Sequence, residues 1–360
     1  MNIDQVLAAA NWKKPEKVVG DGEFFIASIG LDHGHIYGIT EGLISAGAQL
    51  KWVYGEPEQM QQFSKSFPQA KIANSEEEIL RDPQVHMVVS ASVPSERAPL
   101  GIRVMNAGKH FFVDKAPMTT LSQLNQVREA CLRTEKKYAV AYTERIFSES
   151  AYFADLLIKR WAIGKVLQVI GLGPHHLHAH DRPSWFFERE KYGGILFDIG
   201  SHQIEQFLYY TGAQDATITG SSVANYNHPA YPELEDFGEI NVLADNGSTG
   251  YFRVDWFTPD GLSAFGDGRT LILGTDGFIE LRKYVNLGMK GELAGMDHVL
   301  WADHAGEYYC NVTGKIGLPF FGQLIRDCLD GTEIAMTQQH ALKAAELCLL
   351  AQLQARKITP

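Results

Sequence analysis

Short apolar segments alternate with amphipathic ones over the first 142 residues, and this alternation limits the folds open to the chain more than any other feature of the sequence. The apolar segments, mostly β-branched or aromatic as in strands buried on both faces, are FFIASIG, LKWVYG, KIAN, HMVVSAS, HFFVDK and YAVAY. Strands that alternate with helices pair in parallel through right-handed crossovers. We therefore expect an α/β domain with a doubly wound parallel sheet over residues 1–142.

The helices between these strands are marked by their first residues. Pro57 is expected to open one helix, because the fixed φ of proline suits the first helical turn. Ser75, with Glu78 three residues later, matches a capping box. Two further helices are expected to begin at capping hydroxyls, those of Ser95 and Thr120.

The second half of the chain follows a different pattern, from about residue 150. Asn246-Gly247 lies between two alternating segments, which is a hairpin signal, and a Thr-Asp-Gly turn predicts a second hairpin later in the chain. Hairpins join antiparallel strands, so residues 143–360 are expected to form an α+β domain with an open, mostly antiparallel sheet. A closing helix over 337–355 is expected to pack back on the first domain.

The composition excludes several classes of protein. The 360 residues carry a net charge of −11 with no basic cluster, which argues against binding to nucleic acid or to anionic membranes. No segment approaches the run of roughly 20 apolar residues that spans a bilayer. The four cysteines lie far apart without a CxxC pair, as is usual for reduced thiols in a cytoplasm. We expect a cytoplasmic enzyme that acts on small molecules.

A glycine-containing turn, GLDHGH, follows the first predicted strand, where a dinucleotide-binding protein has its phosphate-binding turn. Its first, third and sixth positions, normally glycines, are Gly30, Asp32 and His35, and Gly34 is an additional glycine. The N–H groups and positive dipole end of a helix beginning near His33 are expected to bind a pyrophosphate. The carboxylate of Asp32 would repel it, so this side chain is expected to turn away, as a helix cap or as a partner of His33 or His35.

Two segments carry candidate catalytic side chains. Lys115 lies at the carboxyl end of a predicted parallel strand, where doubly wound sheets bind ligands, and it can polarise a substrate oxygen. The alternative for Lys115 is a solvated loop lysine. Asp198 and His202 are four residues apart and share one face if the segment is helical, so the histidine can take a proton from an alcohol. The alternative for this pair is a helix cap and a buried structural histidine.

A histidine-rich tract precedes that segment. If His176, His178 and His180 alternate on a strand, they point the same way and could form a zinc site. Such tracts also form the polar walls of ligand pockets. No further metal-ligand motif accompanies the tract. We therefore expect no bound metal, and we expect His176 or His178 to contact substrate hydroxyls.

Six segments in register resemble the Gfo/Idh/MocA family, which includes glucose–fructose oxidoreductase and inositol dehydrogenase. Besides the turn, these segments are VDKAP, TERIF, AIGKV, GGILFDIGSHQIEQF and LGTDGFIEL. The resemblance implies a Rossmann domain followed by a substrate domain, and reversible oxidation of a sugar, a polyol or a related carbinol by NAD or NADP. It also implies a homodimer or homotetramer that pairs through the open sheet.

The resemblance assigns roles to particular residues. His202 would be the general base, Lys115 the group that polarises the reacting oxygen, and Asp198 an orienting or substrate-binding group. The expected substrate-binding residues are Arg145, His176, His178, Trp185, Asp198 and His202. The expected cofactor-binding residues are Gly30, Leu31, Asp32, His33, Gly34, His35, Glu56, Ser92, Pro94, Asp114 and Lys115.

The choice between the two cofactors depends on the end of the second predicted strand. Gly55 stands where a carboxylate usually binds the ribose, and Glu56 follows it. Glu56 and Glu58 would repel a 2′-phosphate, and no lysine or arginine stands beside them to receive one. We therefore expect NAD in preference to NADP.

The sequence departs from the family pattern at the turn and at Ala116, where the family has a proline after its lysine. Two further functions remain as alternatives. One is a family member that binds a sugar-like ligand without nicotinamide turnover. The other is a metal-assisted lyase or hydrolase that uses the tract from His175 to His180.

Overall fold

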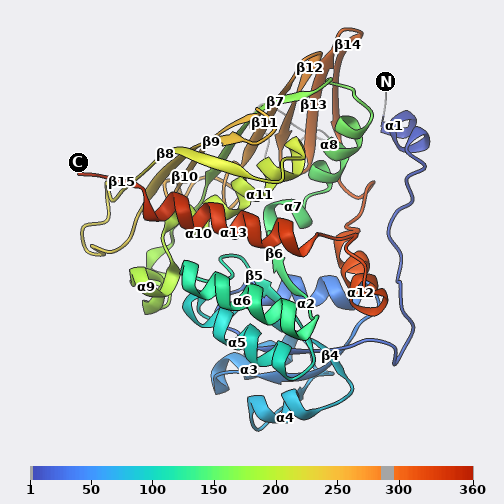
Figure 1. Cartoon of the computed structure of the whole chain (residues 1–360), viewed down its shortest axis with the longest axis vertical. Coiled ribbons are helices and arrows are strands. Elements are labelled where there is room, and N and C mark those ends of the chain that lie inside the picture. The colour runs from blue at the N-terminus through green and yellow to red at the C-terminus, as the bar shows by residue number, and fades with distance from the viewer. Residues whose placement is uncertain (1–2, 285–295, 360) are drawn as a thin grey trace.

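The computed structural model describes residues 3–284 and 296–359, and in Figure 1 the two halves of the chain lie one above the other. Among these residues, the first half forms a sheet of six parallel strands in the order β3-β2-β1-β4-β5-β6. The strands are β1 (Phe25–Ile29), β2 (Gln49–Tyr54), β3 (Lys71–Ile72), β4 (Val85–Ser90), β5 (His110–Asp114) and β6 (Tyr138–Ala141). The predicted doubly wound parallel sheet is confirmed.

Helices alternate with these strands along the chain. They are α1 (Ile3–Ala9), α2 (His35–Ser45), α3 (Pro57–Ser66), α4 (Glu76–Arg81), α5 (Pro94–Asn106) and α6 (Leu121–Thr134). The caps at Ser75 and Thr120 are confirmed, because each hydroxyl accepts a hydrogen bond from the backbone N–H three residues later, at 3.2 and 3.1 Å. The expected cap at Ser95 is wrong. α5 begins one residue earlier, at Pro94, whose φ already suits a first helical turn.

The second half forms a sheet of nine strands in the described residues, in the order β14-β13-β12-β11-β7-β10-β9-β8-β15. The strands are β7 (Val166–Pro174), β8 (Ala216–Ala224), β9 (Phe237–Ala244), β10 (Thr249–Asp255), β11 (Arg269–Gly274), β12 (Gly277–Arg282), β13 (His298–Asp303), β14 (Gly306–Asn311) and β15 (Arg356–Ile358). β7 pairs in parallel with β10, as β8 does with β15, and the other neighbouring pairs are antiparallel. The predicted open, mostly antiparallel sheet is confirmed, with both hairpins.

The helices of the second half connect it to the first. They are α7 (Thr143–Ile146), α8 (Glu149–Lys159), α9 (Arg189–Tyr192), α10 (Ile195–Asp198), α11 (Gly200–Thr211), α12 (Phe320–Asp330) and α13 (Gln338–Leu353), with two 3-10 turns, η1 (Ala179–Asp181) and η2 (Ser184–Phe187). α11 packs on β7 and β10. α13 crosses between the halves in Figure 1 and contacts α6 and β6 as well as α10, α11 and β8. An ion pair of 2.9 Å between Arg128 and Glu346 joins α13 to α6.

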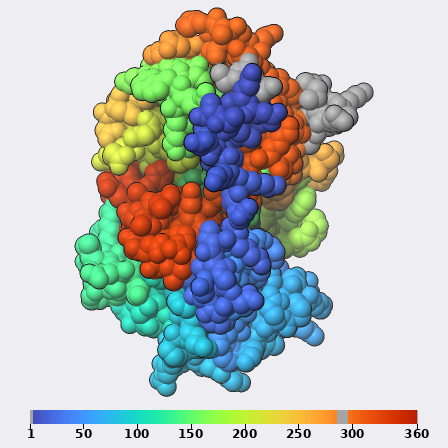
Figure 2. Space-filling model, turned by 90° about the vertical axis from the view of Figure 1, so that its right-hand side faces the viewer, coloured from blue at the N-terminus to red at the C-terminus, as the bar shows by residue number. Residues whose placement is uncertain are grey.

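The N-terminal segment also joins the two halves. Figure 2 shows this segment, in blue, running over the surface beside orange residues of the second half and down to the first half. Trp12 Nε1 donates a hydrogen bond to the carbonyl of Ile316, and Lys14 Nζ donates one to that of Gly314, both at 3.0 Å. No helix in the described ranges is long and apolar enough to cross a membrane.

The carboxyl edge of the first sheet faces the second half of the chain. Residues that follow β1, β5 and β6 line one cavity together with residues of α10 and α11 and of the segment after β7. Open parallel sheets bind their ligands at this edge. The topology therefore places the candidate site between the two halves.

Candidate active site

The candidate site is a cavity of about 420 Å³ between the two halves of the chain. Its charged and imidazole-bearing residues are His33, His35, Lys115, Glu144, His175, Arg182, Asp198 and His202. Aromatic side chains from the second half complete the wall, among them Phe186, Trp256 and Phe265. An apolar wall with a few converging polar groups is typical of a small-molecule site.

Lys115 and Asp198 form a buried ion pair in this cavity. Lys115 directly follows β5 and Asp198 ends α10, so the packing of the two halves brings the charges together. The ammonium of Lys115 donates a hydrogen bond to Oδ1 of Asp198. Burial would raise the pKa of Asp198, but the charge and hydrogen bond of Lys115 outweigh it, and the pKa is lowered. Asp198 is therefore a carboxylate at neutral pH, and Lys115 has further N–H groups for a substrate oxygen.

His202 lies about one helical turn beyond Asp198, and the two residues belong to two consecutive helices. α10 ends at Asp198, and α11 begins at Gly200 after a break at Ile199. Burial lowers the pKa of His202 from 6.5 to about 3, because a charged imidazole is poorly solvated there. In the described part of the chain its Nδ1 has no hydrogen-bond partner. The imidazole is neutral at neutral pH and can accept a proton.

The GLDHGH turn connects β1 to α2 and bends sharply at Gly30. This glycine has a φ of 74°, and a Cβ at its position would lie 2.6 Å from the Cβ of Ser92, beyond the end of β4. Both observations exclude a larger side chain. The first glycine of the nucleotide turn is therefore retained for a steric reason.

The rest of the turn leaves backbone donors unpaired. Among the described residues, the N–H groups of Leu31, Asp32 and Gly34 donate to no acceptor, and they precede the first turn of α2. No atom lies within 4 Å of a Cβ placed on Gly34, so the space above the turn is open. Unpaired N–H groups at a helix N-terminus suit phosphate oxygens. The turn therefore fits the pyrophosphate of a dinucleotide.

Asp32 turns away from the neighbouring histidines, but its partner is not one that the sequence suggests. Gln59 Nε2 donates a hydrogen bond to Oδ1 of Asp32 at 3.2 Å. α2 begins at His35 rather than near His33, and no side chain caps it. The expectation that Asp32 caps the helix or pairs with a histidine is wrong, because Gln59 of α3 lies within reach and both histidines have another partner.

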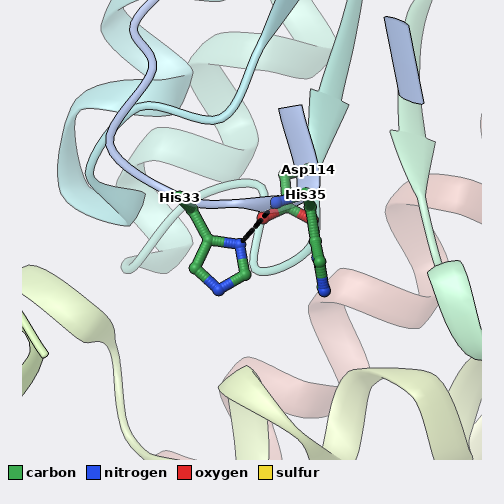
Figure 3. A group of neighbouring side chains, drawn as sticks. All are labelled: His33, His35 and Asp114. Atoms are coloured by element: carbon green, nitrogen blue, oxygen red, sulfur yellow. Dashed lines mark hydrogen bonds and ion pairs between the residues drawn. The ribbon is translucent and has the colours of Figure 1, made fainter. Parts of the chain in front are cut away.

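That partner is Asp114, the last residue of β5 (Figure 3). Nδ1 of His33 lies 3.0 Å from Oδ2 of Asp114, and Nδ1 of His35 lies 2.8 Å from Oδ1. Arg97 Nη2 also donates to Oδ2, at 3.2 Å. Burial opposes the charge of Asp114, but His35, Arg97 and His33 outweigh it and hold the pKa of Asp114 well below its usual value. Burial, with the neighbouring His35, lowers the pKa of His33 to about 4.

The other expected cofactor residues lie along the same edge of the sheet. Glu56 directly precedes α3 and is separated from the end of β2 by Gly55. Ser92 lies between β4 and α5, and Pro94 opens α5. In the strand order β2-β1-β4, these positions flank the turn on both sides. A dinucleotide along this edge would lie beside all of them.

Comparison with known families decides the assignment. Residues 29–142 match the oxidoreductase family with an NAD-binding Rossmann fold, and residues 154–280 match the Gfo/Idh/MocA C-terminal domain. The two matches together span more than half of the chain. The chain belongs to the Gfo/Idh/MocA oxidoreductase family. The resemblance found in the sequence is thereby confirmed.

Three proteins illustrate what this chain is similar to. A crystal structure from Erwinia carotovora atroseptica, assigned as an oxidoreductase, is 47% identical, covers 94% of this chain and 100% of its own, and has a TM-score of 0.90. D-xylose dehydrogenase of Paenarthrobacter nicotinovorans is 25% identical over 52% of this chain and 48% of its own length. A scyllo-inositol 2-dehydrogenase of Bacillus subtilis, named for NADP⁺, is 24% identical over 52% of this chain and 53% of its own length. The chain spans about half to two thirds of the length of the curated relatives it matches.

In this Gfo/Idh/MocA member, Arg145 does not line the cavity as the family resemblance suggests. It is buried, donates a hydrogen bond to Glu205 at 2.6 Å, and stacks on the ring of Tyr209 at 4.1 Å. The preceding residue, Glu144, lines the cavity instead. Neighbouring residues of a helix point about 100° apart. The motif therefore locates α7, but it does not tell which of its side chains faces the cavity.

The histidine tract is not a strand, so the premise of a zinc site of alternating histidines is wrong. His178 has a φ of 47°, and η1 follows it directly. His175 lines the cavity, whereas His176 and His178 are not among its lining residues. His180 is exposed and lies 3.3 Å from Asp181.

Trp185 is also not among the lining residues, and its neighbour Phe186 contributes to the wall. Sequence reasoning missed further lining residues, among them Glu144, Arg182, Trp256 and Phe265. Glu144 precedes the predicted residue Arg145 in the TERIF segment, so it could have been found by considering both of these side chains. The others lie in loops or at a strand end, where only tertiary packing decides which side chains meet the cavity.

Proposed function

We propose that this chain reversibly oxidises a CH–OH group of a sugar, a polyol or a related carbinol, with NAD as the hydride acceptor. The meeting of Lys115, Asp198 and His202 in one cavity that also borders the GLDHGH turn carries this proposal. The turn comes from the first half of the chain, and the Asp198–His202 pair comes from the second. A hydride-transfer enzyme requires the nicotinamide beside the carbinol carbon and a proton acceptor beside the carbinol oxygen, and the residues proposed for both tasks border this cavity.

The chemical roles follow from the charge states of the three residues. His202 is neutral and takes the hydroxyl proton of the substrate. Lys115 donates a hydrogen bond to the same oxygen and stabilises the negative charge that develops on it. Asp198 holds Lys115 through their ion pair and can accept a hydrogen bond from a second hydroxyl. A bound nicotinamide supplies the hydride acceptor.

The residues that would hold the dinucleotide are those of the edge described above. The unpaired N–H groups of Leu31, Asp32 and Gly34 would bind the pyrophosphate. Glu56 would accept hydrogen bonds from the ribose hydroxyls. The hydrogen bond from Gln59 of α3 would hold the Asp32 carboxylate away from the bound phosphates, and this would reduce its repulsion of them.

NADH is expected to bind more tightly than NADPH, by about tenfold or more, which corresponds to about 1.4 kcal/mol. Glu56 and Glu58 are both exposed at the start of α3 and would repel a 2′-phosphate. Fluorescence titration with each reduced dinucleotide measures the ratio. Glu56→Gln should reduce the preference, whereas Glu16→Gln, an exposed control away from the turn, should leave it unchanged. Tighter binding of NADPH by the unmodified chain, as the name of the scyllo-inositol relative would suggest, would contradict the expected preference.

We also propose that two or four copies assemble through the open sheet. Its outer face carries partly exposed apolar side chains on β9, β11 and β12, namely Leu243, Leu271, Leu273 and Phe278, with exposed fractions of 38% to 47%. Covering such side chains releases water and favours association. Sedimentation should show a dimer or tetramer, and Leu273→Asp should dissociate it. A monomer at all concentrations would disprove the assembly.

A further inference from the structure

Three possible metal-ligand groups that take no part in the proposed proton transfer meet at the edge of the cavity, which two of them line. They are the imidazoles of His33 and His35 and the carboxylate of Asp114, and their donor atoms all lie within 4.8 Å of one another. Figure 3 shows the two rings meeting the carboxylate from different directions. The two histidine–carboxylate separations are 3.0 and 2.8 Å.

These separations are close to those found around a metal ion. Imidazole nitrogen and carboxylate oxygen lie about 2.0–2.2 Å from a bound Zn²⁺. In a tetrahedral site two such ligand atoms are therefore about 3.3–3.6 Å apart. The two observed separations, 3.0 and 2.8 Å, are those of hydrogen bonds, so an ion that replaces the shared hydrogens requires the imidazoles to turn and to move away from the carboxylate by a few tenths of an ångström.

The carboxylate is held firmly in place. Asp114 is fully buried at the end of β5, and Arg97 binds both its side chain and its backbone carbonyl. The guanidinium also donates to the carbonyls of Lys115 and Ala116. Outer partners that fix a ligating carboxylate are a regular feature of metal sites. The two histidines come from the short turn before α2, so one rigid strand end and one turn supply the ligands.

We propose that His33, His35 and Asp114 bind a single divalent transition-metal ion, with its remaining coordination positions open to the cavity. The set of two imidazoles and one carboxylate favours Zn²⁺, Fe²⁺ or Co²⁺ over Mg²⁺ and Ca²⁺, which prefer oxygen ligands. Because both histidines line the cavity, an oxygen of a phosphate or of a hydroxyl group can complete the coordination. The site goes beyond the proposed dehydrogenase function, and it differs from the expectation from the sequence that no metal is bound.

A second group of possible ligands, His176, His178 and Asp260, provides a comparison. Its two histidine–carboxylate separations are 3.8 and 3.9 Å, and the side chain of Asp260 is 96% exposed. No arginine fixes that carboxylate in the described residues, and ordering it would cost side-chain entropy. The Asp114 group is both tighter and better anchored, so the ion is assigned to it.

The test is a titration of the chelator-treated full chain with Co²⁺ alone, without dinucleotide, followed by visible absorption and by metal analysis after dialysis. A single ion per chain is expected, with absorption bands of nitrogen-ligated Co²⁺ that excess Mg²⁺ does not remove. His35→Gln should abolish the bands. If that variant fails to fold, His33→Gln replaces it in the experiment, with the same expected loss. His178→Gln, the same substitution in the second group, should keep them. Zn²⁺ should raise the melting temperature of the unmodified chain and leave that of His35→Gln unchanged.

Absence of bound ion in the unmodified chain would overturn the assignment. Loss of the bands in His178→Gln with retention in His35→Gln would also overturn it, because the ion would then belong to the second group. Neither result bears on the proposed dehydrogenase function, which is measured separately by NADH binding and turnover.

Discussion

Replacing His202 with alanine is expected to lower the rate of carbinol oxidation by ~10²–10⁴ without unfolding the chain. The imidazole is the proposed proton acceptor, and burial lowers its pKa to about 3, so it is uncharged at neutral pH. Without it, the hydroxyl proton would have to leave to water. Initial rates of NADH formation measure the effect, and a thermal melt verifies the fold. His180→Ala, the same change at an exposed position outside the cavity, is the matched control. Near-normal turnover of His202→Ala would refute this role.

The same reasoning applies to Lys115, with one additional consequence. Its removal leaves Asp198 as an unpaired buried carboxylate, which destabilises a fold by about 3–5 kcal/mol. Lys115→Ala should therefore lose activity as severely as His202→Ala and should also melt earlier. Lys115→Arg should not restore the rate, because the planar guanidinium differs from the ammonium in shape and hydration.

Acid is expected to destabilise the fold from about pH 6.5 downward, above the range in which carboxylates titrate. Burial lowers the pKa of His202 to about 3 and that of His110 to about 4, from an ordinary value of 6.5. Between these values the unfolded chain binds more protons than the folded chain, so the free energy of unfolding falls as the pH falls. His202 alone contributes a loss of about 2 kcal/mol at pH 5, as an upper estimate.

Urea unfolding of the metal-free chain at a series of pH values measures this dependence. The slope of the unfolding free energy against pH measures how many more protons the unfolded chain binds than the folded chain. In His110→Gln, a substitution outside the cavity, this number should be smaller by up to one. A free energy of unfolding that stays constant from pH 6.5 to 5 would show that these histidines are not buried in the neutral form.

The architecture could be predicted from the sequence because both sheets have local signals. Most strands of the first sheet are short apolar segments, with the two-residue β3 as the exception, and the turn at Gly247 marks a hairpin through its positive φ. The prediction of a helix cap at Ser95 was wrong because two helix-start signals, a hydroxyl and a proline, stand side by side, and the proline determines the first turn of α5.

The candidate site could be predicted only where a motif ties a residue to an element. Lys115 and His202 come from such motifs, and both lie in the cavity. The pairing of His35 with Asp114 joins residues 79 apart in the sequence, and no local pattern encodes it. The prediction that Arg145 lines the cavity was wrong for a related reason. Its hydrogen-bond partner, Glu205, holds it outside the cavity and lies 60 residues away in the sequence.

The central claim is that one cavity combines a dinucleotide with a carbinol and the Lys115–Asp198–His202 group. It is tested most directly by incubating the purified chain with NAD⁺ and a panel of polyols and sugars, and by recording NADH absorbance. The account predicts NADH formation with at least one member of the panel, and its loss in His202→Ala under the same conditions. A chain that binds NADH tightly yet forms none with any polyol or sugar, or that forms it equally well without His202, would contradict the account.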